Sequence, residues 1–456
     1  MAAFLQPLTF LPFLPSPNSD FNFTRSNPTR SRRLRKANVL IMEANSSSEI
    51  TDAKSTKLIT FLGKGGSGKT TAAVFAAQHY AKEGLKTCLV THSLDLTTEY
   101  LLNCKIGTTP VICSDNLSAV RLETTKMLLD PLKRLKKADA HVNVTQGALA
   151  GIVGEELGVL PGMDSIFSAL SLENFVGTFG IKSLSTDFKN KFDVVVYDGI
   201  STPDTLRMIS AARSARLYVK YLRSIAEKTD FGRLIGPSVV RLVNEAINLS
   251  GSSSNFNGKM SSEIWDALER ILERGASTFA DPQKFGCYIV TDTSNPLSVN
   301  TALRYWGCTI QAGANISGVL GIASKPSSVE SLESVRETFL PLPLAFFPNL
   351  SKNSSLDWDM ILSDIENKNA RDLLHLPSVK PSNITPPVKF DPSKRSITLF
   401  MPGFDKSEIK LYQYRGGSEL LVEAGDQRRV IVLPRQIQGK VGAAKSTDRN
   451  LVLTMQ

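Results

Sequence analysis

Long apolar runs and paired cysteines are both missing from this 456-residue chain. No stretch reaches the roughly 18 consecutive apolar residues that a membrane-spanning helix needs, so we expect no integral membrane span. Cysteine occurs only five times and never as Cys-x-x-Cys. This spacing excludes a disulfide framework and leaves a thiolate zinc site without ligands, so we expect no zinc and a reducing compartment.

Acidic residues are nearly absent from the first 42 residues, which hold six basic residues against the single acid Asp20. A basic, hydroxyl-rich and acid-poor start is typical of an organelle transit peptide. Prolines within 10–15 would interrupt an amphipathic helix or a signal-peptide core, so residues 1–44 are predicted to direct the chain to the chloroplast stroma. Another plastid or the mitochondrion is the alternative address, and a disordered basic tail or nucleic-acid arm is the alternative interpretation. The charge on the remaining chain gives no reason to expect nucleic acid as a partner.

Three further regions differ in pattern. Between residues 57 and 351, apolar strand-like runs alternate with helical patterns, which favours an α/β fold with a mostly parallel sheet. Prolines then recur in the segment 377–393, which we interpret as a stiff linker. Residues 394–456 contain six short strand-like runs at close spacing, so this part is predicted to be an all-β sandwich.

A glycine-rich loop follows the apolar run 57–62 and leads into an alanine-rich helical pattern. It has the form G-x-x-x-x-G-K-[ST], in which the glycines let main-chain N–H groups surround phosphates at a helix start. Lys69 should reach the β- and γ-phosphates, and Thr70 should ligate Mg²⁺. The predicted nucleotide-binding residues are Gly63, Lys64, Gly65, Gly66, Ser67, Gly68, Lys69, Thr70 and Thr71.

With Lys64 as a second lysine, this loop resembles that of the ArsA family of ATPases, which includes the ATPase for guided entry of tail-anchored proteins. The resemblance extends over about residues 57–350. It implies a P-loop NTPase fold, ATP and Mg²⁺ as ligands, and ATP hydrolysis. It also implies a homodimer in which Lys64 reaches the partner's nucleotide, where its charge would act as an arginine finger does.

The apolar run 193–198 ends in Asp198, where the family has its Walker B aspartate, so Asp198 is predicted to be catalytic and to hold Mg²⁺ directly or through water. The positions that follow match the family's second switch, Asp-Thr-Ala-Pro-Thr-Gly-His-Thr-Leu-Arg, at Thr202, Thr205, Leu206 and Arg207.

The first switch departs from the family pattern Ser-Thr-Asp-Pro-Ala-His. Ser93 stands where the family has its water-positioning aspartate, and Asp95 follows two residues later. This departure predicts either slow hydrolysis or a substitute acid, for which Asp95 is the candidate catalytic residue. The alternative interpretation of Asp95 is a solvated loop acid. Pro348, after the apolar run 344–347, resembles the family's loop beside the nucleotide base.

The family places its client-binding helices within about residues 120–190. Here one face of a predicted helix carries Met163, Ile166, Phe167 and Leu170 at helical spacing. These side chains either pack in the core or line a groove for a hydrophobic client segment.

The carboxyl-terminal strands resemble the α-crystallin domain in their order and in the turn Pro402-Gly403-Phe404, with an unrelated immunoglobulin-like sandwich as the alternative. Together these features predict an ATP-gated homodimer that holds hydrophobic, tail-anchored-type protein segments in the chloroplast. The alternatives are a metal- or cofactor-handling ATPase of the same wider class, and a nucleotide-gated scaffold with little turnover.

Overall fold

The computed structural model describes residues 55–92, 95–123, 163–177, 192–228, 261–322, 329–347, 356–375 and 385–456. The predicted transit peptide 1–44, Pro348, and the segments 124–162 and 178–191 of the predicted client region lie outside the described residues.

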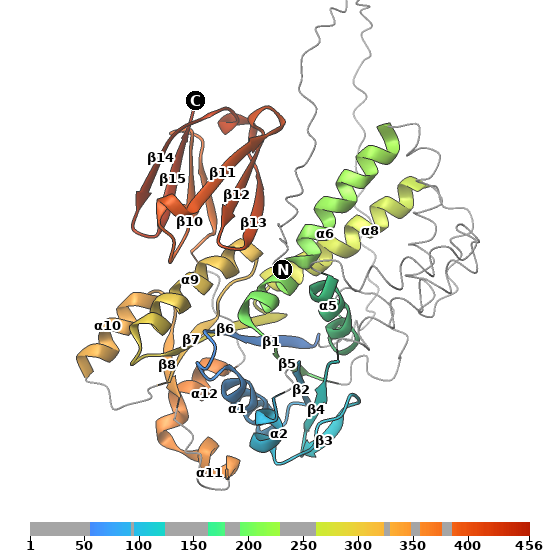
Figure 1. The fold of residues 1–456 in the computed structure, drawn as a ribbon, viewed down its shortest axis with the longest axis vertical. Helices are drawn as coiled ribbons and strands as arrows, with labels where there is room; N and C mark the ends of the chain where they lie inside the picture. The colour runs from blue at the N-terminus through green and yellow to red at the C-terminus, as the bar shows by residue number, and fades with distance from the viewer. Residues whose placement is uncertain are drawn as a thin grey trace, which may run out of the picture. The chain divides into compact units, whose positions relative to one another are not determined.

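Within the described ranges, eight strands form one mixed sheet in the order β3-β4-β2-β5-β1-β6-β7-β8 (Figure 1). β3 is antiparallel to β4, and the other neighbouring strands are parallel. The mostly parallel α/β sheet predicted from the sequence is confirmed. The strands are β1 (Lys57–Leu62), β2 (Thr87–Thr91), β3 (Val111–Ser114), β4 (Leu117–Arg121), β5 (Val194–Asp198), β6 (Phe285–Asp292), β7 (Gly318–Ile322) and β8 (Leu344–Phe347).

Helices cover both faces of this sheet, because its central strands are apolar on both sides. One face packs against α1 (Lys69–Lys82), α2 (Thr97–Leu102), α11 (Trp358–Ser363) and α12 (Lys368–Leu374). The other packs against α5 (Met163–Val176), α6 (Thr202–Lys228), α8 (Ser261–Ala280), α9 (Pro296–Ala312) and α10 (Val329–Phe339). No helix among those described is long and apolar enough to cross a membrane.

The carboxyl-terminal domain consists of two antiparallel sheets, with strand orders β14-β15-β10-β9 and β11-β12-β13. Their facing residues, such as Ile397, Leu420 and Leu453, are fully buried, so the predicted sandwich is confirmed. The strands are β9 (Val388–Asp391), β10 (Ser396–Phe400), β11 (Ile409–Tyr414), β12 (Glu419–Ala424), β13 (Gln427–Val432), β14 (Val441–Thr447) and β15 (Asn450–Met455).

Strand β9 lies within the segment 377–393 that the sequence predicts to be a stiff linker, so the linker prediction is wrong for Val388–Asp391. Phe390 pairs with Ile397 of β10 in an antiparallel register. Prolines flank β9 on both sides, and a sheet tolerates them there because β9 is an edge strand.

The sandwich packs directly on α9. The ring of Trp306 meets Phe400 edge to face, with 5.3 Å between centroids. Gly307 faces the loop after β10 so closely that a Cβ atom would lie 2.3 Å from the carbonyl oxygen of Pro402. Only glycine allows this approach of a helix to the sandwich.

Candidate nucleotide site

The glycine-rich loop connects the carboxyl end of β1 to α1 and is packed against the neighbouring strands. Gly68 precedes α1 with φ of 88°, and a Cβ atom there would lie 2.3 Å from Cδ1 of Ile322 on β7. A Cβ atom on Gly63 would lie 2.3 Å from the carbonyl oxygen of Val290 on β6. Both glycines are therefore required for the path of the loop, which positions it at the carboxyl edge of the sheet.

The start of α1 is suited to an anion. Its first intrahelical hydrogen bond runs from the N–H of Ala72 to the carbonyl oxygen of Gly68, at 2.9 Å. Helix geometry leaves the N–H groups of the preceding turn without intrahelical acceptors, and the helix dipole adds partial positive charge there. Gly65 and Gly66 are exposed at the mouth of this loop, so a phosphate group can approach the main chain.

Lys69 and Thr70 extend from this helix start toward the end of β5. The ammonium group of Lys69 lies 3.5 Å from the carbonyl oxygen of Lys64. Burial lowers the pKa of Lys69, while the nearby carboxylate of Asp198 acts to raise it. The hydroxyl of Thr70 lies near the Asp198 carboxylate and acts to lower its pKa. The predicted phosphate-binding lysine, hydroxyl and acid thus lie together.

Asp198 is a buried acid with an unused oxygen. It is 3% exposed, and its Oδ2 atom has no hydrogen-bond partner among the described residues. Burial raises its pKa to about 6, although Thr70 and Lys69 act in the opposite direction. A carboxylate oxygen beside a hydroxyl is the oxygen donor set that Mg²⁺ prefers. Thr70 and Asp198 would therefore hold Mg²⁺, which supplies positive charge to the β- and γ-phosphates.

Thr202, at the start of α6, ties the second switch to the phosphate loop. Its Oγ1 atom accepts a hydrogen bond from the N–H of Gly63 at 2.9 Å and donates to the carbonyl oxygen of Gly63 at 2.7 Å. The sequence matched Thr202 to the family's switch but did not assign it this contact. The two residues are 139 positions apart, so only the fold brings them together.

His92 is a neighbour of this site that sequence reasoning missed. The main-chain N–H of His92 donates a hydrogen bond to the main-chain carbonyl oxygen of Asp198 at 3.0 Å, which extends the pairing of β2 with β5. Its Nδ1 atom lies 3.3 Å from the hydroxyl of Tyr197. Its position in the sequence could have indicated this, because His92 is the first residue after the carboxyl end of β2, the strand beside β5.

Asp95 lies at the start of α2. One of its carboxylate oxygens accepts a hydrogen bond from the N–H of Thr97 at 3.1 Å, and the other accepts from the Thr97 hydroxyl at 2.8 Å. These bonds lower the pKa of Asp95. Its negative charge in turn raises the pKa of Asp198, so the two acids face the same region. Asp95 therefore supports α2, and its role in hydrolysis stays a prediction.

The predicted client-facing residues lie on α5, which is a helix as expected. Phe167 is 4% exposed and belongs to the hydrophobic core. Ile166 and Leu170 are half-buried, and Leu170 packs against the same core. The side chain of Met163 lies outside the described residues. The burial of Phe167 thus agrees with the core-packing interpretation and not with a client groove.

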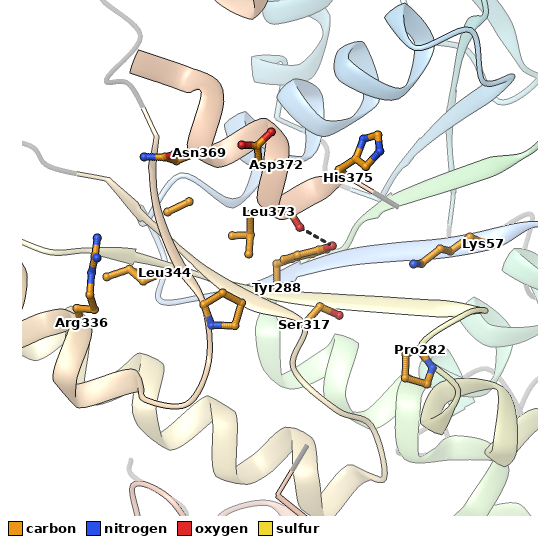
Figure 2. Close-up of a pocket in the computed structure, with 12 residues that line it drawn as sticks. Lys57, Pro282, Tyr288, Ser317, Arg336, Leu344, Asn369, Asp372, Leu373 and His375 are labelled. Atoms are coloured by element: carbon orange, nitrogen blue, oxygen red, sulfur yellow. Dashed lines mark hydrogen bonds between the residues drawn. The ribbon is translucent and has the colours of Figure 1, made fainter. Parts of the chain in front are cut away.

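Figure 2 shows a pocket whose lining contains no residue of the glycine-rich loop 63–71. Lys57 begins β1, Ser317 directly precedes β7 and Leu344 begins β8, so the pocket lies at the amino ends of parallel strands. Ligands of open α/β sheets bind outside the carboxyl ends of the strands. The nucleotide site is therefore the glycine-rich loop. Across the described ranges, no group of three His, Cys, Asp or Glu residues could hold a metal ion.

Comparison with known proteins agrees with this site. A family model described as anion-transporting ATPase, ArsA, matches residues 56–316, and a model of the HSP20-like domain found in ArsA matches residues 392–455. A putative arsenical pump-driving ATPase of Prosthecochloris vibrioformis is 22% identical over 84% of this chain and 91% of its own length. ATPase ASNA1 homolog 2 of Paramecium tetraurelia is 30% identical over 35% of this chain and 46% of its own length. ATPase GET3 of Malassezia globosa is 24% identical over 53% and 66%, respectively.

Proposed function

The chain belongs to the ArsA family of anion-transporting ATPases and has an HSP20-like domain, and from this membership we propose that it is a homodimeric factor that captures hydrophobic, tail-anchored-type protein segments in the chloroplast. Family membership establishes that it binds and hydrolyses ATP. The client, the dimer and the compartment are parts of the proposal.

Helix α6 is the single observation that carries this proposal. It has 27 residues, which corresponds to about 40 Å at 1.5 Å per residue. The hydroxyl of its first residue, Thr202, forms two hydrogen bonds with the main chain of Gly63 in the phosphate loop. Farther along, Leu217, Tyr218 and Tyr221 are exposed by 41%, 69% and 66%. One rigid element thus connects the nucleotide to an exposed apolar surface.

These three side chains lie on a face that α8 does not cover. α8 packs on the other side of α6, where Val219 contacts Trp265 and Arg223 pairs with Asp266 at 2.6 Å. Large exposed apolar side chains that cluster on one helix typically mark an interaction site. An apolar client helix is the occupant that such a face accepts, in the helix-in-groove manner. The position of α6 would make its binding depend on the nucleotide state.

The dimer is supported by Lys64. Its side chain is partly exposed at the mouth of the phosphate loop, while Lys69 takes the inner position beside Asp198. A second cation that is not needed inside the loop is available to a nucleotide on another copy, where its charge would stabilise the transition state. The chloroplast address rests on the basic, acid-poor segment 1–44.

The test combines Tyr218→Glu with Tyr221→Glu in the full chain. A fluorescent peptide of about 20 apolar residues, the length of a membrane-spanning helix, serves as the client, and capture is measured with ATP and with ADP. We expect at least tenfold weaker capture with unchanged basal ATPase activity, because α6 keeps its contacts with the phosphate loop and α8.

Tyr412→Glu is the matched control, since Tyr412 is an exposed tyrosine of the carboxyl-terminal sandwich at 44% exposure. It should leave capture unchanged. If the double variant captures the peptide as well as the unmodified chain does, α6 is not the client surface.

A further inference from the structure

Two of the five cysteines lie side by side. The thiol of Cys113 donates a hydrogen bond to Sγ of Cys104 at 3.0 Å. Both side chains are partly exposed, whereas Cys88, Cys287 and Cys308 are buried. A disulfide bond of about 2.05 Å requires these sulfur atoms to approach by about 1 Å more. The fold therefore joins the two accessible thiols of the chain, which the sequence had not suggested as a pair.

Cys104 lies just past the C-cap Asn103 of the short helix α2. The N–H of Cys104 donates to the carbonyl oxygen of Glu99 in that helix at 3.1 Å. At the other end, α2 begins at Thr97. The main-chain N–H and the hydroxyl of Thr97 each donate a hydrogen bond to one carboxylate oxygen of Asp95. Only six residues of helix separate these two ends, so a restraint on Cys104 also restrains Asp95.

Cys113 belongs to β3, which is an edge strand of the main sheet. The helix α2 is already tied to this part of the sheet, because Glu99 pairs with Arg121 of β4 at 2.7 Å. A helix of six residues has little stability of its own and depends on such ties for its position. A bond between Cys104 and Cys113 would add a covalent tie on the same side.

We propose that Cys104 and Cys113 form a reversible disulfide that holds α2 and Asp95 against the sheet, so that oxidation slows ATP hydrolysis. This inference concerns the ATPase activity alone and does not depend on the proposed client.

The chemistry is a thiol–disulfide exchange with a small-molecule disulfide such as oxidised glutathione. The Cys113 thiol donates its hydrogen atom to Sγ of Cys104, and burial raises the pKa of Cys113 to about 12, so Cys104 is the first to react, as a thiolate. That thiolate attacks one sulfur of the oxidant, forms a mixed disulfide and releases one thiol. Cys113 then loses its proton, attacks Sγ of Cys104 and releases the second thiol. The protein loses two hydrogen atoms, and the oxidant is reduced to two thiols.

The experiment treats the reduced full chain with oxidised glutathione and measures the intact mass, the peptides that are linked and the rate of ATP hydrolysis. We expect the loss of two hydrogen atoms, a Cys104–Cys113 linked peptide, and a rate at least threefold lower that dithiothreitol restores. Cys104→Ser and Cys113→Ser should each hydrolyse ATP at the rate of the reduced, unmodified chain, with or without oxidised glutathione. Cys308→Ser should respond to oxidised glutathione as the unmodified chain does.

Several results would overturn the inference. One is glutathione adducts without a Cys104–Cys113 link, and another is a link between other cysteines. A Cys104–Cys113 link that leaves the rate unchanged or raises it would also overturn the inference, because α2 would then not be restrained as proposed. The mass measurement on the unmodified chain decides the first two, even if a serine variant fails to fold.

Discussion

Substitution of Phe167 by aspartate separates the core from the client surface. Phe167 is 4% exposed on α5 and packs within the same core as the central strands. Truncation of a buried phenylalanine costs about 3–5 kcal/mol. An unpaired carboxylate at the same place adds a desolvation penalty of several kcal/mol. The sum exceeds about 5 kcal/mol, which is comparable to the whole stability of a typical domain, about 5–15 kcal/mol.

We therefore expect Phe167→Asp to remove the cooperative thermal transition of the ATPase domain, as followed by near-ultraviolet circular dichroism, and ATP binding to disappear with it. Two controls bracket this result. Phe167→Leu should cost less than about 1.5 kcal/mol, because the core stays apolar at similar volume. Tyr218→Asp should change stability by no more than about 0.5 kcal/mol, because Tyr218 is 69% exposed. An unchanged melt for Phe167→Asp, together with lost peptide capture, would refute the core assignment.

Three further predictions concern the nucleotide site. Lys69→Ala should weaken ATP binding by roughly 10- to 100-fold, as expected for loss of a charged hydrogen bond of about 1.5–3 kcal/mol; titration with a fluorescent ATP analogue measures this, and unchanged affinity would contradict the assignment. Lys64→Ala should keep that affinity but hydrolyse poorly in steady-state assays, so normal turnover would argue against a role across the dimer. In Mg²⁺-free buffer, Asp198→Asn should melt at a higher temperature than the unmodified chain at pH 7. Because burial raises the pKa of Asp198 to about 6, the unmodified chain loses stability as the pH rises from about 4 to 6, by on the order of 3 kcal/mol. The difference between the two proteins should therefore vanish near pH 4, and a difference that persists there would contradict this cause.

The sequence predicted those parts of the site that lie within one short motif or at the end of a recognisable apolar strand. The loop 63–71 follows a strand and starts a helix, so its place at the carboxyl edge of the sheet was implied by the motif itself. The end of a second apolar strand placed Asp198 at the same edge. These expectations needed only local patterns and the general rule that parallel strands share one carboxyl edge.

Contacts between distant segments could not be predicted in this way. The hydroxyl of Thr202 reaches Gly63, 139 positions away, only because α6 begins beside the phosphate loop in the fold. The contact between Cys113 and Cys104 spans only nine positions, but it depends on how β3 lies beside the residues that follow α2. For Phe167, helical spacing correctly predicted a helix with Phe167 on the same face as Ile166 and Leu170. The same spacing fits a core and a groove equally well, since it does not reveal what covers the face.

The attachment of the HSP20-like domain depends on apolar packing more than on charge. Arg207 of α6 pairs with Asp426 of the sandwich at 3.3 Å, but these side chains are 48% and 63% exposed, so the pair contributes about 0–1 kcal/mol. By contrast, Trp306 and Phe400 are 4% and 7% exposed in the same core. At about 25 cal/mol per Å² and roughly 200 Å² for each ring, the burial of the two rings contributes at most about 10 kcal/mol. The sandwich is therefore fixed to α9, and a movement of α6 would change the weak Arg207–Asp426 contact before it disturbed the aromatic packing.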